Sequence, residues 1–180
     1  MIDLGWHSRE ITYIAISASL WSVINALLSP YFFAATRLPF LCDFLGVLAL
    51  MLVTWKVRKF GAATSVGIIS TFITLSLNPN MVQFLGFGIA SIVFDVICFG
   101  IGYSRIYDSL HSALAVVPAV AMAFTGGVAI GLLFMAQRSI EFALWWGGLH
   151  AVGGAIGGIV GAVVLNALGR RISVNGNSYA

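Results

Sequence analysis

Long apolar runs separated by short polar segments fill almost the whole chain. Each run is near the ~20 residues with which a helix crosses ~30 Å of hydrocarbon. The six runs are Ile11–Leu28, Leu38–Trp55, Phe60–Leu77, Gln83–Gly102, Ala113–Gln137 and Phe142–Leu168. They lack the two-residue alternation of membrane β-strands. The pattern therefore predicts an all-α integral membrane bundle of six transmembrane helices.

Composition supports this class. Of the 180 residues 60% are apolar and 8% charged, with a mean hydropathy of +1.01. A soluble domain of this size could not bury so much apolar surface. We divide the chain into an N-terminal segment 1–10, a transmembrane domain 11–168 and a polar tail 169–180. Because no G-x-x-x-x-G-K-[ST] nucleotide loop is present, energy for active transport would come from another chain.

Lysines and arginines are distributed unequally between the two sets of loops. With the N-terminus in the cytoplasm, the inner set is Arg9, Lys56, Arg58, Lys59, Arg105, Arg170 and Arg171, and the outer set is Arg37 and Arg138. This bias follows the positive-inside rule. We therefore expect both termini in the cytoplasm, and the net charge of +3 needs no nucleic-acid partner.

Two other features of the apolar runs have simple interpretations. The first run resembles a secretory signal in length, but Asp3 and Glu10 precede it against a single Arg9. Since a second span follows at once, we expect the first run to be retained. Cys42 and Cys98 both fall inside runs, which favours buried thiols over a disulfide.

Strong hydrogen-bonding side chains gather toward the outer ends of the predicted helices, at ~1.5 Å of depth per residue. They are Asn25, Tyr31, Arg37, Asp43, Gln83, Gln137, Arg138, Glu141 and His150, whereas Asp95 lies nearer mid-depth. A charge inside the membrane costs at least ~2.5 kcal/mol on insertion scales, so the two aspartates need partners or a wet cavity. Either they line a ligand pocket, or each caps a helix or pairs with an arginine, for example Asp43 with Arg37.

The segment 141–164, EFALWWGGLHAVGGAIGGIVGAVV, combines seven glycines with two tryptophans and a histidine. Glycines at four-residue spacing form two rows, Gly153, Gly157 and Gly161, and Gly154 and Gly158, which favour close helix packing. His150 shares their inward face, and Trp146 lies one turn above it. Trp145 and Trp146 suit an interfacial aromatic belt. Together with Glu141 and His150, they also suit the wall of a site for a flat, partly positive ring.

The chain resembles the substrate-binding S-components of energy-coupling factor (ECF) transporters. The first span and the basic residue before it, SREITYIAISASLWSVINALLSP, are similar to the family's first helix, where a basic residue precedes a face of small residues. The turn WKVRKFGAATSVG resembles the short cytoplasmic link ahead of the family's Gly/Ala-rich third helix. The length, the six spans and the inward termini agree as well.

The resemblance implies capture of a vitamin or vitamin precursor at the extracellular side of a prokaryotic inner membrane. It also implies association with a transmembrane coupling protein and two ATPase subunits, and no catalytic activity or cofactor of its own. The family's alanine-x-x-x-alanine docking face corresponds here to Ala15-x-x-x-Ser19, with Ala18, Ser22 and Ala26 in a second small row. Its pocket is built from the outer ends of helices four to six, capped by the first outer loop.

The candidate ligand-binding residues are Asn25, Tyr31, Arg37, Asp43, Gln83, Asp95, Glu141, Trp145, Trp146 and His150. Metal-binding relatives begin Met-His, and this chain begins MIDLGWH, which argues against a metal at His7. The Glu, Trp, Trp, His set suits thiamine or its pyrimidine precursor. Arg37 and Arg138 could equally bind a carboxylate or phosphate.

Two other classes were weighed. An ion- or proton-coupled carrier would use Asp43 and Asp95 as a relay, but inverted repeats are not evident and the inner halves of the spans are nearly free of polar groups. A membrane enzyme would need a set such as H-E-x-x-H or G-x-S-x-G, and neither occurs.

Overall fold

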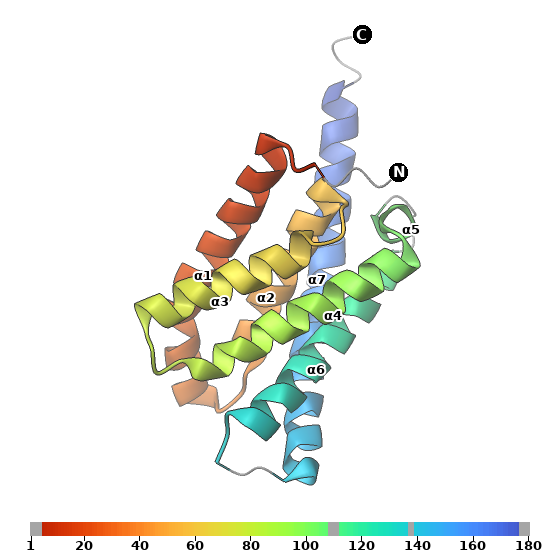
Figure 1. Cartoon of the computed structure of the whole chain (residues 1–180). Helices are drawn as coiled ribbons and strands as arrows, with labels where there is room; N and C mark the ends of the chain where they lie inside the picture. The colour runs from red at the N-terminus through yellow and green to blue at the C-terminus, as the bar shows by residue number, and fades with distance from the viewer. Residues whose placement is uncertain (1–4, 108–111, 137–138, 177–180) are drawn as a thin grey trace.

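The computed structural model describes residues 5–107, 112–136 and 139–176, and this part of the chain is helical throughout, without strands. Six long helices run alternately up and down, with the N-terminus of the first and the C-terminus of the last at one end of the bundle (Figure 1). They are α1 Ser8–Thr36, α2 Phe40–Val57, α3 Ala62–Leu77, α4 Leu85–Ile101, α6 Val116–Leu133 and α7 Ile140–Gly176. Three short helices complete the chain: η1 Val82–Phe84, α5 Tyr103–Tyr107 and η2 Ser112–Ala115.

Five of these segments are long and apolar enough to cross a membrane: α1, α2, Val82–Ile101, α6 and α7, the last counted over Ile140–Gly169. They expose large apolar side chains, as at Leu27 (61% exposed), Phe99 (56%) and Val163 (63%). An apolar surface of this extent requires lipid contact. The expectation of an all-helical, multi-pass membrane protein is confirmed, whereas α3, with 16 residues, is shorter than the other spans.

The bounds of the first span and of the last two differ from the sequence expectation. Helix α1 runs past Leu28 to Thr36. The run Ala113–Gln137 becomes the 3-10 turn η2 followed by α6, which ends at Leu133. Helix α7 continues to Gly176, so residues 169–176 of the expected tail are helical. Gln137 and Arg138 lie outside the described residues.

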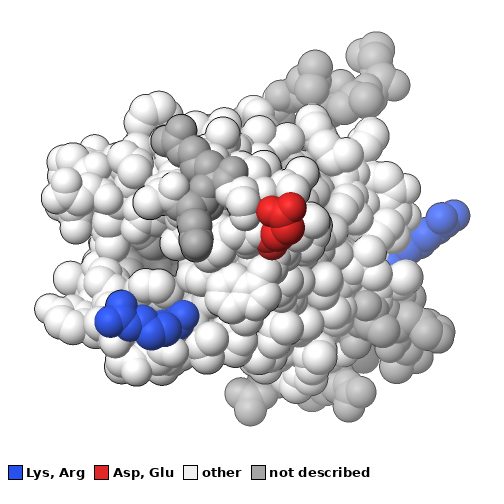
Figure 2. Space-filling model, turned by 90° about the horizontal axis from the view of Figure 1, so that it is seen from below, with Lys and Arg blue, Asp and Glu red and all other residues white. Residues whose placement is uncertain are grey.

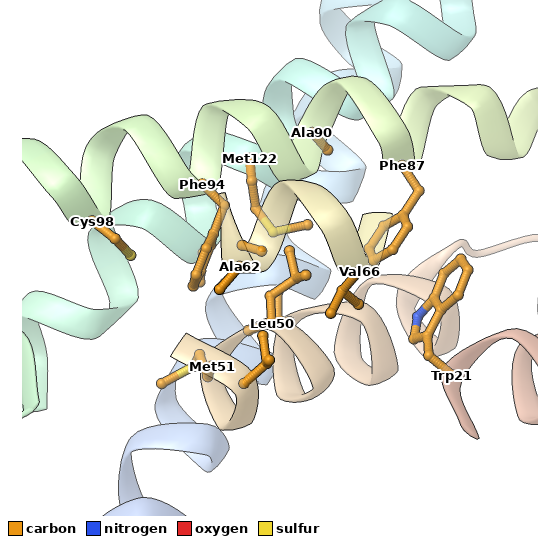
Figure 3. Close-up of a cluster of buried hydrophobic side chains, with 14 of the residues drawn as sticks. Trp21, Leu50, Met51, Ala62, Val66, Phe87, Ala90, Phe94, Cys98 and Met122 are labelled. Atoms are coloured by element: carbon orange, nitrogen blue, oxygen red, sulfur yellow. The ribbon is translucent and has the colours of Figure 1, made fainter. Parts of the chain in front are cut away.

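Helix α7 packs against both α2 and α6. Helix α4 packs between α6 and α3, and α1 packs on α2 and α3. The core between them is filled by apolar side chains from all six long helices, with Leu50 of α2, Phe94 of α4 and Met122 of α6 at its centre (Figure 3). Trp21 of α1 closes this core by stacking on Phe87, with ring centroids 3.9 Å apart.

The glycine rows of α7 face two different neighbours. Gly153, Gly157 and Gly161 face α2, and Gly154 and Gly158 face α6. A Cβ atom at Gly157 would lie 3.1 Å from the Cα of Phe44. One at Gly154 would lie 2.7 Å from the carbonyl oxygen of Ala119. The prediction that these glycines permit close helix packing is therefore confirmed.

Asp95 of α4 holds the first turn of α3. Its Oδ2 accepts hydrogen bonds from the backbone N–H of Gly61 (2.8 Å), the backbone N–H of Thr64 (3.1 Å) and the Thr64 hydroxyl (2.9 Å). Its Oδ1 accepts one from the Tyr103 hydroxyl of α5 (3.1 Å). The open N–H groups at a helix start need such partners. Of the two interpretations of this aspartate, the structure shows the helix cap.

The two small rows of α1 lie in different surroundings. Ala18 and Ser22 are buried against α3, where the Ser22 hydroxyl donates to the carbonyl of Ser70 (3.1 Å). Ala15 and Ser19 are exposed on the part of the helix surface next to this buried face. Only the second pair is available to a partner protein in this structure.

We expect Gly154→Ala to lower the free energy of unfolding by about 1–3 kcal/mol, the usual cost of overpacking a tight contact. Its new methyl group would lie 2.5 Å from the Cβ of Ala123. Thermal unfolding of the purified protein in detergent would measure the change. Gly148→Ala on the same helix is the matched control, since its Cβ meets no atom within 4 Å. Equal melting temperatures for the two variants would contradict the packing described for α7.

Candidate functional site

A cavity of about 480 Å³ lies at one end of the bundle. The C-terminal ends of α1, α3 and α6 and the N-terminal ends of α2, α4 and α7 surround it. Figure 2 views this end of the molecule and shows few charged side chains on it. Its volume falls in the range of small-molecule sites, roughly 300–1,000 Å³. The basic α2–α3 connection, with Lys56, Arg58 and Lys59, is at the opposite end.

Six aromatic rings line the cavity, together with three amide side chains that lie toward its exposed rim. The rings are Phe32, Phe33, Phe84, Phe87, Phe134 and Trp146, and the amides are Asn78, Asn80 and Gln83. Helix ends supply these side chains because each long helix starts or stops at this level. Such a lining accepts a flat apolar body and offers hydrogen bonds at the entrance.

An aspartate–histidine pair lies in the cavity wall. Asp43, in the first turn of α2, and His150, of α7, are 7% and 5% exposed, and Oδ1 of Asp43 is 2.8 Å from Nδ1 of His150. An ionised carboxylate can only accept, so the Nδ1–H of the imidazole donates. In the neutral ring, Nε2 is then an acceptor.

Two glycines make room for this pair. A Cβ at Gly153 would lie 2.7 Å from Oδ2 of Asp43, and one at Gly127 of α6 would lie 2.7 Å from Cδ2 of His150. Any larger residue at either position would displace one member of the pair. The glycines of α6 and α7 therefore position the polar groups of the cavity as well as packing the helices.

Three polar atoms of the cavity side chains are buried and lack a hydrogen-bond partner within the described part of the chain. They are Oδ2 of Asp43, Nε2 of His150 and Nε1 of Trp146. Each unsatisfied buried group costs about 1–3 kcal/mol. Three more buried atoms of the described bundle, Nε1 of Trp21, Nδ2 of Asn25 and Oγ1 of Thr74, also lack a partner but do not line the cavity. The cavity is distinguished by having three such groups on one wall, where a ligand could supply partners.

Trp146 is held in place by other rings. It stacks with Phe142 (centroids 6.0 Å apart, 13° between planes) and meets Phe33 edge-on (6.2 Å, 82°). His150 meets it edge-on as well, at 5.5 Å. The indole is therefore fixed across the side of the cavity between α1 and α7.

The structure brings together part of the predicted set. Asp43, Gln83, Trp146 and His150 line the cavity, and the partner of Asp43 is His150 in place of the suggested Arg37. The remaining candidates, Asn25, Tyr31, Arg37, Asp95, Glu141 and Trp145, are not among its lining residues. Trp145 and Tyr31 are 58% and 78% exposed, so both suit contact with lipid headgroups.

Asn25 supports the wall from behind. It is fully buried, and its Oδ1 accepts a hydrogen bond from the hydroxyl of Ser29, which does line the cavity. Asn25 therefore acts on the site through its neighbour.

Sequence reasoning missed the aromatic wall and two amides of the rim. The phenylalanines resemble any other apolar residue of a span. Asn78 and Asn80, in contrast, stand in the connection between α3 and η1, LNPN, where two amides flank a proline. That cluster is the signal from which the rim could have been found.

Comparisons of the chain with protein-family models, curated proteins and solved structures found no match. The site is therefore interpreted from its own geometry. Among the described residues, no group of three or more His, Cys, Asp or Glu side chains could hold a metal ion.

We expect a strong coupling between Asp43 and His150. Removing either partner alone leaves a buried polar group unpaired, which costs about 3–5 kcal/mol for a charged pair. Asp43→Ala combined with His150→Ala should therefore cost less than the sum of the two single changes. Thermal unfolding of the three variants in detergent measures this cycle. Additive losses would show that the two side chains do not interact.

Proposed function

We propose that this protein is the substrate-capture subunit of an ECF-type importer, which binds a small flat organic molecule and delivers it with a separate coupling protein and ATPases. The observation that carries the proposal is the 480 Å³ cavity with aromatic walls and three unpartnered polar atoms. Its size and lining suit a ring system with a few hydrogen-bonding groups. Thiamine and its pyrimidine precursor are the first vitamin-like candidates.

The position of the cavity supports capture from outside the cell. It lies at the end of the bundle opposite the basic α2–α3 connection. If that connection is cytoplasmic, as the positive-inside rule favours, the cavity opens to the extracellular side. A second cavity, in the other half between α2, α5 and α7, has only about 10 Å³. The observed space therefore fits a binding cavity that opens at one end of the bundle better than a channel through the protein.

The carrier alternative fits the structure less well. It would need Asp43 and Asp95 as exchanging proton or ion sites. Asp95, however, accepts four hydrogen bonds from α3 and Tyr103 and does not line the cavity. A carboxylate so engaged is suited to holding a helix in place.

The first experiment is mass spectrometry of small molecules released when the detergent-purified protein is denatured. A stoichiometric heteroaromatic compound would support the proposal and identify the substrate. A protein that emerges empty and binds no vitamin-like compound in calorimetry would contradict it.

We expect Trp146→Ala and His150→Ala each to weaken binding of that compound by at least about 1 kcal/mol, the scale of one aromatic or charge-assisted contact. Trp145→Ala is the matched control, because the neighbouring indole is 58% exposed and outside the cavity. Isothermal calorimetry would measure all three. Unchanged affinity in both cavity variants would remove α7 from the binding site.

We expect Ala15→Trp and Ser19→Trp to leave binding intact and to abolish uptake, because bulky side chains would block close approach of a coupling helix. Both positions are exposed. Ile16→Trp is the control, since Ile16 is 51% exposed and already large. Uptake by cells that also express the coupling proteins gives the measurement. Loss of binding in the first two variants would contradict the assigned docking surface.

A further inference from the structure

The described cavity wall contains one carboxylate and no lysine or arginine. Among the described lining residues, Asp43 is the single carboxylate and His150 the single basic side chain, with no lysine or arginine. Arg37 is exposed and is not a lining residue, and the same holds for Glu141. A bound carboxylate or phosphate would therefore meet the Asp43 carboxylate with no guanidinium or ammonium group to offset the repulsion.

The unpartnered atoms are unevenly balanced between donors and acceptors. Oδ2 of Asp43 accepts, and Nε2 accepts in the neutral ring, because the Nδ1–H is already given to Asp43. Trp146 contributes one N–H donor. Two acceptors against one donor favour a ligand that carries N–H groups on the edge facing α2 and α7. The three atoms have almost no accessible surface in the structure, and Oδ2 of Asp43 lies beside Gly153 of α7. The side chains must therefore turn toward the cavity to bond a ligand.

The walls favour positive charge as well. The faces of aromatic rings carry negative electrostatic potential, and they attract cations within about 6 Å of the ring centre. Here the rings of Phe33, Phe87 and Trp146 come from three different helices around one space. A flat cation inside would contact such faces while a single carboxylate balances its charge.

We propose that the cavity selects small aromatic cations bearing N–H donors and rejects anions of the same size, with Asp43 as the counter-charge positioned by His150. This inference rests on the proposed capture function and specifies the charge of its substrate. Recognition of a carboxylate or phosphate by Arg37 is not supported, because Arg37 does not line the cavity. Arg138, the other arginine considered, lies outside the described residues.

Three two-ring probes of similar size test the inference: protonated 4-aminoquinoline, the neutral 1-naphthamide and the anion 1-naphthoate. Each is titrated into the full-length protein in detergent at neutral pH. We expect the cation to bind at least about tenfold more tightly than naphthoate, the effect of one charge-assisted hydrogen bond. Asp43→Asn, which keeps the acceptor for His150, should reduce cation affinity at least about tenfold. The loss for naphthamide should be smaller than the loss for the cation, because the neutral amide gains no charge-assisted hydrogen bond from Asp43.

Glu141→Gln is the control, because it removes a carboxylate from the same end of the molecule outside the cavity. Its affinities should match the wild type. The wild-type order of the three probes stands as evidence even if Asp43→Asn fails to fold. Equal binding of the three probes, or tighter binding of naphthoate, would overturn charge selection while leaving capture intact.

If none of the probes binds, the net charge of the co-purified molecule decides. A cation supports the inference, and an anion or a neutral compound overturns it. Absence of both probe binding and a co-purified molecule would overturn the capture function itself, so the two failures are distinguishable.

Discussion

The close approach of α7 to α2 and α6 is the constraint on which this structure depends. Lipid is as apolar as a leucine side chain, so helices in a membrane associate through tight packing and hydrogen bonds more than through burial of apolar surface. The same device recurs between α4 and α6, where a Cβ at Gly86 would lie 3.2 Å from the carbonyl oxygen of Gly126. Small residues thus set the distances between the helices that surround the cavity.

This packing has a chemical consequence. Only where the backbones come close can the short side chain of Asp43 reach His150 across the interface between α2 and α7. The pair is buried in a setting where charge is costly, and it retains hydrogen-bonding capacity that the described chain does not satisfy. These unsatisfied groups lower the free energy of unfolding, as is common where a protein binds a ligand.

The sequence predicted the features that follow from periodicity and composition. The all-helical membrane class followed from composition and the lengths of the apolar runs. The packing role of the α7 glycines and the contact between Trp146 and His150 followed from spacing along one helix. The partner of Asp43 could not be predicted in this way, because it lies 107 residues away and depends on which helices are neighbours. For the same reason depth alone did not separate Asp95, a helix cap, from the cavity groups. Sequence also gave no direction to side chains near helix ends, so exposed Trp145 and buried Trp146 looked alike.

The shortness of α3 bears on how the membrane meets the protein. If α3 crosses the membrane, as the expected six-span arrangement requires, its 16 residues extend roughly 24 Å along the helix axis, against about 30 Å of hydrocarbon. Such hydrophobic mismatch is relieved by local thinning of the bilayer or by flanking polar residues that draw water and headgroups inward. The turn after α3 carries Asn78 and Asn80 at the cavity rim. The thinned bilayer, or the water and headgroups drawn inward, would therefore lie beside the cavity entrance. Bilayer thickness would then govern how deeply the entrance sinks below the headgroups, and the lipid composition of the host membrane would tune access to the site.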